Sequence, residues 1–153
     1  MREGFRLAGE IGFRVFESRS GTLLAEVEAE AGRVEAGLAT LDAQFAVIAQ
    51  TGERSLEAEM NRVRGELLLR LEPPDNTGAE AAYTRAIEIA RSQQTRTFEL
   101  RAALSLAKLH HARGRIEDVR ELLEPALVGF SVGPELPEVA EAERLVGRCR
   151  VNL

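Results

Sequence analysis

A pattern of small residues at helical spacing recurs three times along the chain and restricts its fold more than any other feature. Small residues at such spacings let two antiparallel helices approach closely, and one larger residue fills the remaining space between them. The pattern therefore predicts three helical hairpins. Its copies comprise Gly65, Ala79, Tyr83 and Ala86 in the middle, Ala25, Gly32 and Leu41 before them, and Ala107, Gly114, Leu123 and Ala126 after them.

The composition favours an all-α fold. Helix-forming residues dominate, and β-branched runs of strand length are missing. A chain of 153 residues with 44% hydrophobic residues is long enough for one domain with a packed core, and the aromatic share of 5% suits interfaces built from alanine. We expect a single domain over residues 1–153, folded as a stack of antiparallel helix pairs.

Apolar periodicity and turn residues divide the chain into successive segments. Gly32-Arg33 and Gly114-Arg115 predict tight turns inside the outer hairpins, whereas residues 73–78 predict a longer, proline-rich turn in the middle one. Ser55 is the expected N-cap of the helix that follows it. The expected segments are a half hairpin or cap over 2–12, repeats over 13–50, 55–94 and 97–130, and a capping helix over 138–148.

Charge and cysteine content exclude several functional classes. The net charge of −5 gives no general attraction for nucleic acid, which we do not expect as a partner. No apolar run approaches the roughly 20 residues of a membrane span, so we expect no membrane association. Cys149 is the single cysteine, and the N-terminus does not resemble a signal peptide, so the expected location is the cytoplasm.

No group of residues indicates catalysis, because a nucleophile, a base and an orienting group cannot be named together. We expect neither an enzyme nor a cofactor. His110 and His111 are adjacent, so on a helix they point about 100° apart and cannot serve one metal ion, and no metal site is expected. Arg62, Glu66 and Arg70 are spaced by four residues, which predicts solvated ion pairs worth ~0.3 to 0.5 kcal/mol each.

Two stretches, AEMNRVRGELLL at residues 58–69 and AEAAYTRAIEIA at residues 79–90, are similar to the tetratricopeptide C-terminal regions of large bacterial signalling proteins. The similarity continues through ELRAALSLA at residues 99–107 and covers most of the chain from about Gly21. Such proteins join a class III nucleotide cyclase domain or a transcriptional regulator to a P-loop ATPase module and then to this repeat region. The resemblance implies a right-handed superhelical stack of about three tetratricopeptide-like repeats plus flanking helices, with a regulatory or partner-binding role.

In tetratricopeptide hairpins the first helices line a groove, so the resemblance also implies which residues face it. We expect this groove to bind a peptide or a neighbouring domain, as a non-catalytic interaction scaffold. Two alternatives are a self-associating assembly module, which would form a homo-oligomer, and a small-molecule sensor domain of a regulator. The expected groove residues are Arg19, Thr22, Glu26, Arg62, Glu66, Arg70, Arg101, Lys108 and His111.

Overall fold

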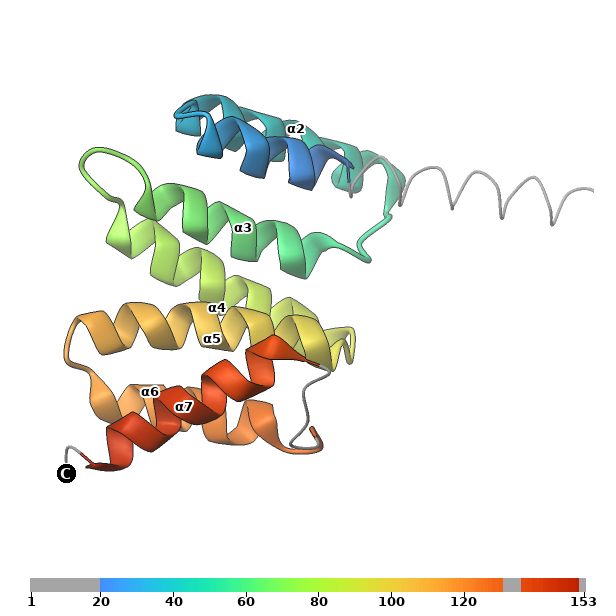
Figure 1. The fold of residues 1–153 in the computed structure, drawn as a ribbon. Coiled ribbons are helices and arrows are strands. Elements are labelled where there is room, and N and C mark those ends of the chain that lie inside the picture. Colours follow the sequence, from blue (N-terminus) through green and yellow to red (C-terminus); the bar gives the residue numbers. More distant parts are fainter. Residues whose placement is uncertain (1–19, 131–135, 152–153) are drawn as a thin grey trace, which may run out of the picture.

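A computed structural model describes residues 20–130 and 136–151, and within these ranges every regular element is a helix (Figure 1). The expected all-α class is therefore confirmed. The expected half hairpin over 2–12, the start of the first repeat at residue 13, and Arg19 lie outside the described residues. The helices are residues 20–30, α2 (Val34–Thr51), α3 (Glu57–Leu69), α4 (Asn76–Ser92), α5 (Arg96–Ala112), α6 (Ile116–Leu127) and α7 (Pro137–Val151).

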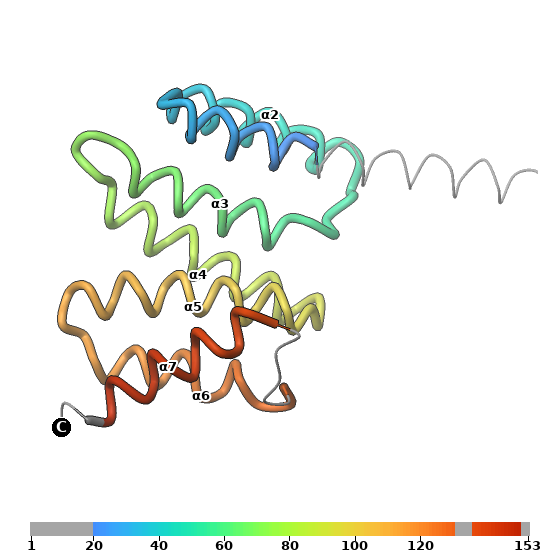
Figure 2. Tube along the Cα trace, viewed as in Figure 1, coloured from blue at the N-terminus to red at the C-terminus, as the bar shows by residue number. Residues whose placement is uncertain are grey.

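The helices stack in chain order, each against the next (Figures 1 and 2). In addition, α3 contacts α5 and α5 contacts α7, whereas among the labelled helices α4 contacts neither α2 nor α6. The helices therefore fall into two rows. We call helix 20–30, α3, α5 and α7 the first-helix row, and α2, α4 and α6 the second-helix row.

Helices α3 and α4 pack antiparallel and in close contact. Ala58, near the start of α3, packs with Ala90 near the end of α4, while Gly65 faces Tyr83 further along the pair. A Cβ atom on Gly65 would lie only 2.5 Å from Cε1 of Tyr83, whose side chain is buried. The small residue thus lets the two helices approach, and the tyrosine ring fills the space beside it, as the sequence pattern predicts.

The first hairpin is equally tight, but its contact lies at Gly37. A Cβ atom there would lie 2.6 Å from the backbone oxygen of Ala25. The hydroxyl of Thr40 donates a hydrogen bond of 2.9 Å to the carboxylate of Glu28 across the same pair of helices. Gly32 serves the turn, where its φ of +77° suits glycine.

Three turns in the stack share one geometry. Gly32, Gln94 and Gly114 have φ values of 77°, 57° and 73°. In each case the next residue donates its backbone N–H to the carbonyl five residues before it, as in Arg115 to His110 at 3.0 Å. This hydrogen bond is the helix-ending arrangement in which glycine is preferred. The two glycine turns were expected, whereas Gln94 adopts the same conformation without being a glycine.

The starts of two helices differ from expectation. Ser55 is not the N-cap of α3, because the helix begins at Glu57 and no side chain caps it. Helix α4 begins at Asn76, so residues 76–78, which were expected in the turn, belong to the helix. The carboxylate of Asp75 caps it by accepting a hydrogen bond of 2.8 Å from the N–H of Gly78.

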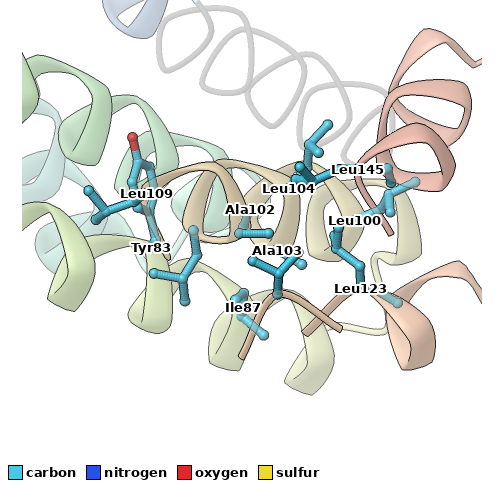
Figure 3. Packing of buried hydrophobic residues seen from close by; sticks show 14 of the residues in the cluster. Tyr83, Ile87, Leu100, Ala102, Ala103, Leu104, Leu109, Leu123 and Leu145 are labelled. Atoms are coloured by element: carbon cyan, nitrogen blue, oxygen red, sulfur yellow. The ribbon is translucent and has the colours of Figure 1, made fainter. Parts of the chain in front are cut away.

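Apolar residues of the helices form the core, although on α2 only Leu41 and Ile48 are buried, while Val34, Leu38 and Phe45 are partly buried. The larger core cluster joins α4, α5, α6 and α7, and Figure 3 shows Tyr83, Ile87, Leu100, Leu123 and Leu145 from these four helices within it. A second cluster joins helix 20–30, α2 and α3. Each hairpin therefore shares its core with its neighbours, and the row of first helices is held in a fixed arrangement.

Candidate functional site

Arg62 lies at the centre of a group of charges on the first-helix row. Its Nη2 atom is 2.8 Å from Oε1 of Glu59 and 3.5 Å from Oε1 of Glu26 on helix 20–30. Its Nη1 atom donates a hydrogen bond to Glu66. Only 8% of the Arg62 side chain is exposed, so the expectation of a solvated Arg62–Glu66 pair is wrong: the pair forms, but the guanidinium is buried.

The surroundings of Arg62 keep it charged. Burial by itself would lower the pKa of the guanidinium, but hydrogen bonds from it to Glu59 and the charges of Glu59, Glu66 and Glu26 raise the pKa above its ordinary value. A buried cation that holds several carboxylates fixes the helices that carry them, and its removal would leave Glu26 and Glu66 without an ion pair among the described residues, while Glu59 would keep Arg101. Arg62 therefore contributes more to holding the first-helix row together than to contacting a ligand.

The charged group continues along the row through Arg101 of α5. Its Nη1 atom is 2.8 Å from Oε1 of Glu59, and its Nε atom is 3.4 Å from Oε1 of Glu138 on α7. Further along, Nζ of Lys108 is 2.8 Å from Oε1 of Glu141. Ion pairs thus join every helix of the first-helix row to its neighbour.

A pocket of about 360 Å³ opens between helix 20–30, α3 and α5. It combines apolar walls with charged and polar groups. Leu23 is notable because 60% of it is exposed although it lies beside the pocket. The lining residues are Thr22, Leu23, Glu26, Leu56, Glu59, Phe98 and Arg101.

The residues expected in the groove fall into three groups. Thr22, Glu26 and Arg101 line the pocket, and Arg62 and Glu66 belong to the group of charges beside it. Lys108 lies on the same row and pairs with α7. Within residues 20–130 and 136–151, no ion pair joins the exposed Arg70 or the half-buried His111 to this group, and Arg19 lies outside those residues.

Sequence reasoning missed Leu23, Leu56, Glu59 and Phe98, all of which line the pocket. A signal for three of them was present. The interval of 42 residues that separates Gly65 from Ala107 also separates Leu56 from Phe98 and Glu59 from Arg101 (98 − 56 and 101 − 59). Equivalent positions of neighbouring repeats lie side by side in a stack, so this interval relates residues that meet at the pocket.

A second charged cluster ties the second-helix row to α5. The carboxylate of Glu80 lies 2.8 Å from both Arg113 and Arg115 and 3.2 Å from Nε2 of the buried His110. A hydrogen bond from Arg115 lowers the pKa of the Glu80 carboxyl. Within the described ranges, no group of three or more His, Cys, Asp or Glu side chains is arranged to hold a metal ion. This cluster therefore fastens α4, α5 and the start of α6 together.

A scan against models of protein families and a search of curated proteins gave no match to the chain. None of the helices in the described residues is both long and apolar enough to cross a membrane.

Proposed function

We propose that this chain is a non-catalytic protein-interaction domain, in which the first-helix row binds a peptide segment or a neighbouring domain. We further propose that its hairpins are tetratricopeptide-like repeats in a right-handed superhelix, and that the domain works in bacterial signalling from the cytoplasm. The observation that carries the proposal is the pocket between helix 20–30, α3 and α5, which combines exposed apolar surface with charged side chains.

The packing of the two rows supports this proposal. Helices α3, α5 and α7 contact one another in sequence, whereas α4 contacts neither α2 nor α6 among the labelled helices. A stack curves toward the row whose members are closer together, because the other row must spread. Helical repeat proteins use the inner side of such a curve to bind partners.

The chemistry of the pocket also suits a protein ligand. Leu23, Leu56 and Phe98 provide apolar surface, and Glu26 and Arg101 provide charge beside it. Protein interfaces combine an apolar centre with a polar rim in this way. A side chain of a partner that covers the exposed part of Leu23 would gain roughly 25 cal/mol for each Å² of apolar surface removed from water.

Site-specific photo-cross-linking tests the proposal. We expect a benzophenone amino acid at Leu23 or Ser105, both on the first-helix row, to give a discrete adduct with one partner in an extract of the native host. The matched control at Thr84, which is exposed on α4, should give none. Purified partner should then bind the Leu23→Asp variant at least about tenfold more weakly.

An adduct from Thr84 alone, or unchanged affinity of Leu23→Asp, would place the binding surface elsewhere. Leu23 suits this test because it is largely exposed, so its replacement leaves the core intact. Reversing the charge of Arg62 would be a poor test, since loss of a buried cation disturbs folding as well as binding.

Self-association is a second proposed function, and a separate observation favours it. Leu24 and Val27 on helix 20–30 are 50% and 48% exposed, which is unusual for large apolar residues one turn apart. A second copy could cover this surface. Sedimentation velocity across a wide range of concentrations should then show a dimer that Val27→Glu disrupts, and a monomer at all concentrations would reject this function.

A further inference from the structure

Carboxylates outnumber cations around the pocket. Among the described residues, two guanidinium groups are shared by four carboxylates, which leaves a surplus of two negative charges. The group consists of Arg62 and Arg101 with Glu26, Glu59, Glu66 and Glu138. Such an imbalance attracts a positively charged ligand and repels a negatively charged one.

Glu26 is only weakly neutralised within this group. Within the part of the chain that the structure describes, its ion pair is the 3.5 Å contact with Arg62, which lies closer to Glu59 and also binds Glu66. Burial raises the pKa of the Glu26 carboxyl, and this effect outweighs the opposing charge of Arg62. The side chain is nevertheless 37% exposed, so a cation from outside can reach it.

Apolar surface lies directly beside this carboxylate. Leu23 is three residues before Glu26, so the two side chains share one face of helix 20–30, and Leu56 and Phe98 also line the pocket. A volume of about 360 Å³ is at the small end of ligand pockets, which suits one or two side chains rather than a large cofactor.

We propose that this pocket selects peptide segments in which a lysine or arginine lies close to a large apolar side chain. Glu26 pairs with the basic group, and the apolar group is held between Leu23, Leu56 and Phe98. This inference rests on the proposed function of the first-helix row and specifies the chemistry of its ligand.

Three synthetic peptides of equal length, each labelled with fluorescein, test the selectivity by fluorescence anisotropy with the full chain. The first alternates lysine and leucine within a serine and glycine background, the second replaces each lysine with glutamate, and the third replaces each leucine with alanine. The lysine–leucine peptide should bind about tenfold more tightly than either of the others, and its affinity should fall with added salt. Equal affinity of the first two peptides, or no measurable binding of the first, would overturn the proposal.

Variants of the chain locate the interaction. Glu26→Gln should weaken binding of the lysine–leucine peptide about five- to tenfold, and Glu26→Lys should shift the preference toward the glutamate–leucine peptide. Glu88→Gln is the matched control, because Glu88 is 58% exposed on α4 and pairs there with Arg85. Circular dichroism confirms that each variant is folded. An unchanged affinity of Glu26→Gln for the lysine–leucine peptide would refute the role of Glu26.

The two proposals fail in distinguishable ways. A partner that cross-links to Leu23 but whose affinity does not depend on Glu26 would support binding by the first-helix row and would reject the preference for basic segments. A peptide preference that depends on Glu26 supports both. Absence of any adduct at Leu23 and Ser105, together with equal peptide affinities, would reject both.

Discussion

Replacement of Gly65 by alanine should destabilise the domain, although alanine is the better helix former. In the interior of a helix this exchange normally gains about 1 kcal/mol. At Gly65, however, the added Cβ would lie 2.5, 2.7 and 2.8 Å from three ring atoms of Tyr83, well inside the 3.5 to 4.0 Å of an ordinary carbon contact. The ring is buried, so it cannot move aside without displacing its neighbours.

The expected loss follows from these two opposing effects. Overpacking costs about 1 to 3 kcal/mol, and contacts as short as these correspond to the upper end of that range. Subtracting the gain in helix propensity leaves a net loss of about 2 kcal/mol. For a domain of this size, the midpoint of thermal unfolding should fall by roughly 4 to 8 °C. Urea unfolding followed by circular dichroism measures the loss directly, provided that the slope is unchanged.

Gly147 provides the matched control. It lies within α7, is exposed, and a Cβ atom there would meet nothing within 4 Å. Gly147→Ala should therefore stabilise the domain by up to about 1 kcal/mol. In a Tyr83→Leu background the cost of Gly65→Ala should shrink, because the ring that it strikes is absent. Equal effects of the two glycine replacements would refute the close approach of α3 and α4.

Three further changes test other parts of the structure. A hydrogen bond from Arg115 lowers the pKa of the Glu80 carboxyl in the folded state. The ionised Glu80 side chain therefore stabilises the fold at pH values above its pKa of 4.5 in the unfolded chain, and this contribution is lost as the pH falls through the lower pKa of the folded state. Glu80→Gln should therefore lower the free energy of unfolding at neutral pH, and urea titrations should show this difference shrinking in acid; a constant difference would contradict the assignment. Gln94→Gly should raise stability by about 0.5 to 1 kcal/mol in thermal unfolding, because it relieves a left-handed conformation, and a loss would argue against that conformation. Arg62→Met should cost about 3 kcal/mol in urea unfolding, since it leaves the carboxylates of Glu26 and Glu66 without their cation, whereas a cost below about 0.5 kcal/mol would indicate an ordinary surface pair.

Most helix boundaries could be predicted because their signals are local. Gly32 and Gly114 end helices through a conformation that glycine favours, and the apolar periodicity then defines the helices between them. Where the signal is ambiguous the prediction fails. The sequence predicts Gly78 to lie in a loop, yet its N–H donates the hydrogen bond by which Asp75 caps α4. Gln94 gives no sign of its conformation, because the hydrogen bonds of the turn impose it on a residue without that preference.

The candidate site was predictable only in part. Alignment on the small residues names Thr22, Glu26 and Arg101 together, and all three line one pocket. It did not reveal the burial of Arg62, because the spacing within α3 shows Glu66 as a partner but not the carboxylate that helix 20–30 supplies. Burial depends on how neighbouring helices are placed, and periodicity within one helix does not contain that information.

Charges at corresponding positions of successive helices explain where the first-helix row neutralises its own charge and where it does not. Glu59 and Arg101 are equivalent and opposite in charge, so they pair at 2.8 Å and neutralise each other within the row. Glu26 and Glu66 are also equivalent, at the interval of 40 residues that separates Ala25 from Gly65 (66 − 26 and 65 − 25), but they carry the same charge and must share Arg62. Opposite charges at equivalent positions stabilise the stack, whereas two carboxylates at equivalent positions leave an excess of negative charge that a further cation would neutralise. The second arrangement occurs at the edge of the pocket, which is where a basic ligand would complete the charge balance.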